Sequence, residues 1–352
     1  MRDPNGALPA QNGADTRRGP GGPASLTRRP EQGRRRRSAS VLAIAAMGEE
    51  RSTKSHAGRA APLIDLDAIP RGRHIQVPGP GELFVREAQG PVGAPVLVLL
   101  HGWCATGGLN WFRAFRPLSQ HFHVLAPDLR GHGRGPRTWR PFQLEDCADD
   151  VAALLRHVGS GPAIVAGYSM GGPVAQLLWK QHRPLVSGLV LCATSDRLIS
   201  GLAERLALRS FTSALAGATR VSRAPVALPR WIVRSALPEA PEGRARHAPR
   251  WAAREARRHD FRMLLEAGTA ISRYDATSWS PEIQVPTAVL LTLEDRLVSK
   301  RAQEAMTQRI PAAKRFPVND GHLACTSEAF PDRLLEACLD VKRRVERAQD
   351  HG

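Results

Sequence analysis

The sequence contains no long apolar run and no paired-cysteine motif. None of its apolar stretches approaches the roughly 18 consecutive residues that a membrane-spanning helix requires. Its five cysteines are odd in number and form no Cys-x-x-Cys pair, which favours reduced thiols in a cytoplasmic protein over a disulfide framework. With 352 residues and 42% hydrophobic content, the chain can nevertheless bury one large core or two modest ones.

Large apolar residues are also scarce in residues 1–60, which are rich in Gly, Pro, Ala and Arg. This segment holds 12 Lys/Arg against 5 Asp/Glu, a net charge of +7, and its composition predicts a disordered tail. An arginine run at 34–37 precedes "SASVLAIAAM", as in a signal peptide, but the apolar part is short and the basic part starts late, so export is disfavoured. No aromatic residues interleave with the arginines, which also disfavours nucleic-acid binding.

Short apolar strands alternate with helical segments from about residue 70 onward. "APVLVLL", "HVLAP", "AIVAG", "GLVLCAT" and "PTAVLL" read as buried strands, and "DRLLEACLDVKRRVERA" reads as a closing helix. Such alternation predicts an α/β fold whose mostly parallel sheet is covered by helices on both faces. We assign residues 70–194 and 281–347 to this core.

More than 80 residues separate "GLVLCAT" from "PTAVLL", where a simple βαβ unit needs roughly 30. The intervening stretch contains helix-forming segments, so we predict a helical cap inserted at 195–280. Residues 196–262 carry 14 arginines against 6 acidic residues, a net charge of +8. This charge suits weak association with an anionic membrane surface, although solvated helix faces are the favoured interpretation of such a charge run.

One serine lies between glycines in the segment "AIVAGYSMGGPVAQ", residues 163–176. Gly167 and Gly171 stand two positions either side of Ser169, and glycine is used where φ is positive or where another backbone approaches closely. A strand, a glycine-flanked serine and then a helix form the context of a nucleophile elbow. We therefore favour a nucleophilic Ser169 over a simple packing turn.

A serine nucleophile needs a histidine base and a carboxylate that orients it. The elbow architecture predicts the chain order serine, acid, histidine, with the last two on loops after later strands. Asp295 follows "PTAVLLTL" and His322 follows the last predicted strand. Glu294 is the alternative acid, and a plain loop residue beside Asp320 is the alternative interpretation of His322.

The other histidines near the serine, His101, His132 and His182, are assigned ordinary loop or helix-surface roles. An acyl-transfer site also needs donors for the developing oxyanion. We choose the backbone N–H groups of Met170 and Trp103, with Gly102 allowing the close approach of the loop.

"LLHGW", "DLRGHGRG", "GYSMGG", "LEDRLV" and "NDGH", in that order, resemble the α/β-hydrolase superfamily over roughly residues 70–345. The pattern is similar to bacterial serine esterases and lipases, monoacylglycerol lipases, and enol-lactone or carbon–carbon-bond hydrolases. The resemblance implies an α/β-hydrolase fold with an eight-stranded sheet, and a triad of Ser169, Asp295 and His322. It implies no cofactor and no metal site.

The expected substrate is a small-molecule acyl ester, with the cap shaping the acyl pocket. Thioester or lactone cleavage, acyl transfer, perhydrolysis and carbon–carbon-bond hydrolysis on the same triad stay open as alternatives. Serine at the elbow disfavours the epoxide hydrolases and haloalkane dehalogenases, which use aspartate. A non-catalytic scaffold is disfavoured because serine, acid, histidine and the glycine turn are all present. The oligomeric state is left open.

Overall fold

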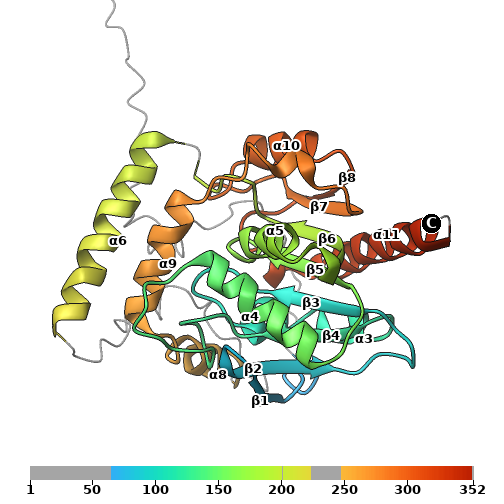
Figure 1. The fold of residues 1–352 in the computed structure, drawn as a ribbon, viewed down its shortest axis with the longest axis horizontal. Helices are drawn as coiled ribbons and strands as arrows, with labels where there is room; N and C mark the ends of the chain where they lie inside the picture. Colours follow the sequence, from blue (N-terminus) through green and yellow to red (C-terminus); the bar gives the residue numbers. More distant parts are fainter. Residues whose placement is uncertain (1–64, 200, 223–246, 351–352) are drawn as a thin grey trace, which may run out of the picture. The chain divides into compact units, whose positions relative to one another are not determined.

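The computed structural model describes residues 65–199, 201–222 and 247–350, which Figure 1 draws in colour. The predicted tail at 1–60 lies outside these residues, as do positions 200 and 223–246 of the predicted insertion.

The described residues form an eight-stranded sheet with the order β1-β2-β4-β3-β5-β6-β7-β8. β1 pairs antiparallel with β2, and β2 pairs antiparallel with β4, whereas the other neighbours are parallel. This confirms the prediction of a mostly parallel sheet. The strands are β1 (Gly72–Val77), β2 (Gly81–Ala88), β3 (Val96–Leu100), β4 (His123–Pro127), β5 (Ala163–Tyr168), β6 (Val186–Cys192), β7 (Thr287–Thr292) and β8 (Ala313–Val318).

The central strands are apolar on both faces because helices cover both faces. In β3, Val98 and Leu100 enter one hydrophobic cluster while Leu97 and Leu99 enter the other. Alternate side chains of a strand point to opposite faces, so a continuous apolar run is what a doubly covered strand requires.

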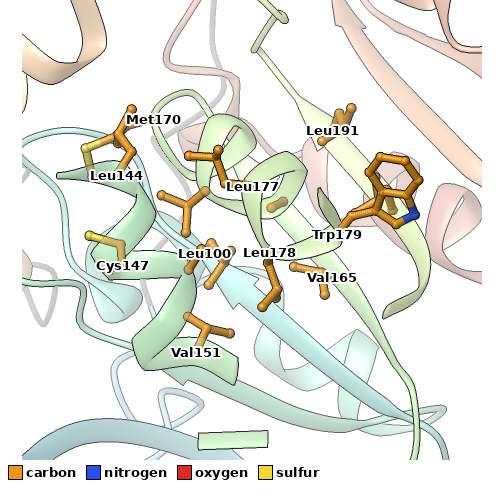
Figure 2. Packing of buried hydrophobic residues seen from close by; sticks show 14 of the residues in the cluster. Leu100, Leu144, Cys147, Val151, Val165, Met170, Leu177, Leu178, Trp179 and Leu191 are labelled. Carbon is orange, nitrogen blue, oxygen red and sulfur yellow. The ribbon is translucent and has the colours of Figure 1, made fainter. Parts of the chain in front are cut away.

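Two sets of helices supply these layers. On one face lie α4 (Leu144–His157), α5 (Gly171–Gln181) and α10 (Lys300–Arg309), and on the other lie α2 (Gly107–Trp111), α3 (Phe115–Ser119) and α11 (Phe330–Asp350). Figure 2 shows the first layer, where side chains of α4 and α5 pack on Leu100, Val165 and Leu191 of the sheet. The short 3-10 helices are η1 (Arg183–Leu185), η3 (Ser280–Glu282) and η4 (Ala324–Thr326).

Among the described residues between β6 and β7, three further α-helices lie within the stretch predicted as an insertion. These inserted helices are α6 (Leu202–Ser222), α8 (His247–Ala256) and α9 (Phe261–Arg273). α6 runs alongside α9 (Figure 1), and the hydroxyls of Thr212 and Thr269 are hydrogen-bonded across the two helices at 2.7 Å. None of the helices in the described part of the chain combines the length and the apolar character that a membrane span needs.

The two ends of the insertion meet at Asp196. Its carbonyl accepts a hydrogen bond from the backbone N–H of Ala276 at 2.7 Å, and its buried carboxylate binds Arg309 at 2.6 and 2.7 Å. Next to it, Arg197 binds the Asp275 carboxylate. The chain thus leaves the sheet and returns to it through one polar junction.

A second junction joins the α8–α9 turn to the loop after β4. Glu255 is buried and accepts two hydrogen bonds from Arg134, at 2.8 and 2.9 Å, and one from Arg86 at 3.3 Å. Asp260 N–H donates to the Gly131 carbonyl at 2.8 Å and the Asp260 carboxylate caps α9. The insertion is therefore fastened to the core where it begins and ends, and also at the α8–α9 turn.

Candidate active site

Ser169 lies in the turn between β5 and α5, with a left-handed φ of +50°. The flanking glycines are required by contacts with the backbone. A Cβ atom at Gly167 would lie 2.2 Å from the Gly171 carbonyl oxygen, and one at Gly171 would lie 2.3 Å from the Leu100 carbonyl oxygen. Real Cβ atoms do not approach so closely, so any larger residue would push the strand and the helix apart.

The structure brings the three residues of the predicted triad together from three separate loops. Ser169 Oγ lies 2.9 Å from His322 Nε2, and His322 Nδ1 lies 2.8 Å from Asp295 Oδ2. Because an ionised carboxylate only accepts hydrogen bonds, His322 carries its proton on Nδ1. Nε2 is then free to accept the serine hydroxyl proton.

Asp295 is held rigidly beneath His322. Its side chain is fully buried, Oδ2 also accepts from the Thr292 hydroxyl at 2.9 Å, and Oδ1 accepts the N–H groups of Leu297 and Val298, each at 2.9 Å. The alternative acid, Glu294, makes no bond to His322 within the described residues. The geometry therefore favours Asp295 as the partner of the histidine.

Tyr168 contributes an interaction that the sequence did not predict. Its hydroxyl donates to the His322 carbonyl at 2.6 Å and accepts from the Cys325 N–H at 3.3 Å. Burial raises the pKa of Tyr168 well above its usual value, so the hydroxyl stays a donor. The residue before the nucleophile thus anchors the loop that carries the base, and no local sequence signal marks a contact across 154 positions.

The loop after β3 lies directly against the nucleophile. A Cβ atom at Gly102 would lie 3.3 Å from Ser169 Cβ, and the Gly102 N–H donates to the Asn110 side chain at 3.0 Å. The Trp103 indole donates to the Leu264 carbonyl of α9 at 2.9 Å, which ties this loop to the inserted helices. Among the described residues, no backbone carbonyl accepts from the N–H groups of Trp103 or Met170.

Three histidine rings are buried behind this loop. His101 Nε2 accepts the Leu129 N–H, and His259 Nδ1 accepts the Gly133 N–H, each at 2.9 Å. The His132 ring lies between them, with its centroid 5.2 Å from that of His101 and 5.6 Å from that of His259. Burial lowers the pKa of His101 and of His259 to about 4, and burial together with the neighbouring rings lowers the pKa of His132 well below its usual value.

The interpretation of His101 and His132 as ordinary loop residues is incomplete, because both are fully buried. The two residues lie in the loops after β3 and β4, but both loops turn inward, and each imidazole forms a hydrogen bond with a buried backbone group. His182, in contrast, lies at the end of α5 and contacts the exposed Asp149 at 2.7 Å.

A family model described as the alpha/beta hydrolase fold matches residues 95–329. The chain belongs to the α/β-hydrolase family. Together with the resemblance of the motifs, the eight-stranded sheet and the strand–serine–helix turn, this match identifies the fold. Its relatives include enzymes named as esterases, lipases and a peptidase, which supports hydrolase activity.

Similarity to individual known proteins varies in its extent. The magnesium-chelatase 30 kDa subunit of Rhodobacter capsulatus is 30% identical over 272 residues, covering 74% of this chain and 91% of that protein. A pimeloyl-[acyl-carrier protein] methyl ester esterase of Chromobacterium violaceum is 41% identical, but over only 30% of this chain and 39% of its own length. The solved structure of a thermophilic esterase from Thermogutta terrifontis has a TM-score of 0.61 and 26% identity, covering 78% of this chain and 99% of that one.

Proposed function

We propose that the chain is a serine hydrolase that cleaves a carboxylic ester through an acyl-enzyme on Ser169. The observation that supports this most strongly is the continuous chain of hydrogen bonds from Ser169 through His322 to Asp295. Its order and polarity are those required to remove a proton from a serine hydroxyl.

In the first half-reaction, His322 Nε2 takes the proton of Ser169 Oγ as the oxygen attacks the ester carbonyl. The Asp295 carboxylate stabilises the resulting imidazolium, and the Trp103 and Met170 N–H groups are the proposed donors to the oxyanion. Collapse of the tetrahedral intermediate breaks the bond to the alcohol, which leaves with the proton from His322. Water then attacks the acyl-enzyme while His322 takes one of its protons, and His322 returns that proton to Ser169 Oγ as the acyl–Oγ bond breaks and the carboxylic acid is released.

The relatives named as esterases and lipases favour an ester over other acyl substrates. A thioester or a lactone would pass through the same acyl-enzyme, and another acceptor in place of water would make the enzyme an acyltransferase or a perhydrolase. Cleavage of a carbon–carbon bond on the same triad is a further alternative. These alternatives differ in the leaving group or the acceptor, so a substrate series separates them.

The test is hydrolysis of p-nitrophenyl esters from two to sixteen acyl carbons by the full chain. Ser169→Ala should lower kcat by about 10⁶-fold, as loss of a triad serine does elsewhere. Ser187→Ala, which removes a partly exposed hydroxyl from β6, is the matched control and should keep wild-type activity. Substantial activity in Ser169→Ala would refute the nucleophile, and a wild-type enzyme inactive on every ester would refute the ester proposal.

A second candidate function, that of a magnesium-chelatase subunit, rests on the alignment with 91% of the Rhodobacter capsulatus protein. It differs from the first in needing no nucleophile. The Ser169→Ala chain should then still co-purify with the other chelatase subunits. Failure of both wild type and variant to co-purify would rule this function out.

A further inference from the structure

The Trp103 side chain joins the loop after β3 to α9 at two neighbouring points. Its indole N–H donates to the Leu264 carbonyl at 2.9 Å. A Cβ atom at Gly268 would lie 2.9 Å from Cζ2 and 3.2 Å from Cη2 of the indole, so the ring occupies the space that this glycine leaves open. Leu264 and Gly268 are four residues apart, and residues at this spacing lie on the same side of a helix. Trp103 is therefore held against one side of α9 by a hydrogen bond and by close packing.

α9 is itself fixed to the core, so it can act as a support for the indole. Just before the helix begins, the Asp260 N–H donates to the Gly131 carbonyl at 2.8 Å. Halfway along the helix, the Glu266 carboxylate accepts the Phe142 N–H at 3.0 Å. Both bonds join α9 to the segment between β4 and α4, and neither involves the loop that carries Trp103. The position of the indole is therefore set by a part of the molecule that does not move with its own loop.

The backbone on either side of Trp103 is held in a defined conformation. The peptide unit that ends in the Trp103 N–H begins with the Gly102 carbonyl, which accepts from His101 Nδ1 at 2.8 Å and from the Ala105 N–H at 3.2 Å. In a planar trans peptide the N–H points away from the carbonyl, so these bonds orient the N–H. Cys104 follows with a left-handed φ of +59°, which is unfavourable for a residue with a Cβ atom. Such a conformation persists only where the surrounding contacts enforce it, and the anchored indole supplies one of these contacts.

We infer that Trp103 is a positioning residue, whose indole is held by α9 and in turn fixes the backbone N–H that donates to the oxyanion. This inference rests on the proposed function, because the N–H acts on the charge of a tetrahedral intermediate. It gives the inserted helices a part in the chemical step itself. A displacement of about 1 Å at such a donor can cost about 10²-fold in rate, and an interaction made only in the transition state changes kcat rather than KM.

Two substitutions disturb the contact from its two sides. Trp103→Phe keeps an aromatic ring but removes the indole N–H, and Gly268→Ala places a methyl group where the ring lies. Each should lower kcat for a p-nitrophenyl ester at least about tenfold at unchanged KM, which is less than the roughly 10²–10³-fold lost with a whole oxyanion donor. The double variant should lose less than the product of the two single losses, because both substitutions break the same contact.

Two matched controls make the same chemical changes away from this contact. Trp139→Phe removes the indole N–H of a side chain that is 71% exposed, and Gly217→Ala adds a methyl group on α6 where no described neighbour lies within 4 Å. Both should keep kcat and KM within about twofold of wild type, a difference close to thermal energy. Urea unfolding is measured for every variant. Trp103→Phe adds no atoms to the interior, so it carries the test even if Gly268→Ala does not fold.

A second measurement follows the rate at which an alkyl fluorophosphonate labels Ser169. In this reaction Ser169 Oγ bonds to phosphorus and gives its proton to His322 while fluoride leaves, and the phosphoryl oxygen gains negative charge as the ester oxygen does. Trp103→Phe should slow labelling by about the same factor as it lowers kcat.

The outcomes separate this inference from the proposed function on which it rests. A wild-type chain that the reagent does not label would refute the nucleophile, and the inference with it. Equal labelling of wild type and Trp103→Phe would overturn the inference alone, because the indole would then support only the fold. A raised KM at unchanged kcat would also overturn it, because the indole would then contact the substrate instead of positioning the donor.

Discussion

The buried histidines predict a steep loss of stability on mild acidification. His101, His132 and His259 connect the loops after β3 and β4 with the α8–α9 turn. Two of their ring nitrogens accept backbone N–H groups, so protonating either would replace a hydrogen bond with a repulsion. The folded protein therefore holds these rings neutral.

The magnitude follows from proton linkage. In the unfolded chain each ring has a pKa of about 6.5, whereas burial lowers the pKa of His101 and His259 to about 4 and that of His132 well below its usual value. Below about pH 6.5 the unfolded chain binds protons that the folded chain does not, so the free energy of unfolding falls as the pH falls. Each ring lowers the free energy of unfolding by up to about 1.4 kcal/mol for every pH unit of acidification. The three rings together lower it by up to about 4 kcal/mol per pH unit.

The assay is urea unfolding at pH values from about 7.5 down to about 5. The free energy of unfolding should be flat at the upper end and should fall steeply below about pH 6. His132→Gln should reduce the slope by about one third, whereas His157→Gln, at an exposed position of α4, should leave it unchanged. A slope in the wild type corresponding to fewer than one proton would refute the neutral cluster.

Two further predictions concern anchors of the site and of the inserted helices. Tyr168→Phe leaves buried backbone groups unpaired, including the His322 carbonyl, so it should destabilise the fold by about 1–3 kcal/mol. It should also lower kcat for a p-nitrophenyl ester about tenfold at unchanged KM, and an unchanged kcat would exclude a positioning role. Glu255→Ala leaves Arg86 buried without its partner, which should cost about 3–5 kcal/mol in urea unfolding. Glu282→Ala removes an exposed ion pair instead and should cost less than about 1 kcal/mol, so equal losses would contradict the argument.

Local patterns in the sequence were sufficient to predict the sheet and the helix layers that cover its two faces. Uninterrupted apolar runs such as that of β3 require cover on both faces, and the structure confirms this with Val98 and Leu97 in opposite clusters. In α4, Val151 and Leu155 recur at helical spacing and both lie on the buried side. These signals are local, because each strand or helix carries its own periodicity.

The candidate site likewise contains residues that the sequence predicted and residues that it did not. The chain order of the elbow architecture predicted which three side chains the structure brings within hydrogen-bonding distance, namely Ser169, Asp295 and His322. The anchoring by Tyr168 and the burial of His101 could not be read in this way. Both depend on contacts between segments far apart in sequence, and an isolated tyrosine or histidine in a loop has the same local appearance whether buried or exposed.

The polar junction at Asp196 marks the boundary between the sheet and the inserted segment. Everything between Arg197 and Asp275 departs and returns at a single point, so the register between β6 and β7 is independent of its length. Because the closure entropy of a loop grows only slowly with length, residues can be added between these two positions at little cost, provided that Glu255 and Asp260 keep their bonds to the core. The pairing of β6 with β7 is thus independent of the number of residues inserted between them. The loops that hold Asp295 and His322 follow β7 and β8, outside this segment, so a change in its length leaves the hydrogen bond between them in place.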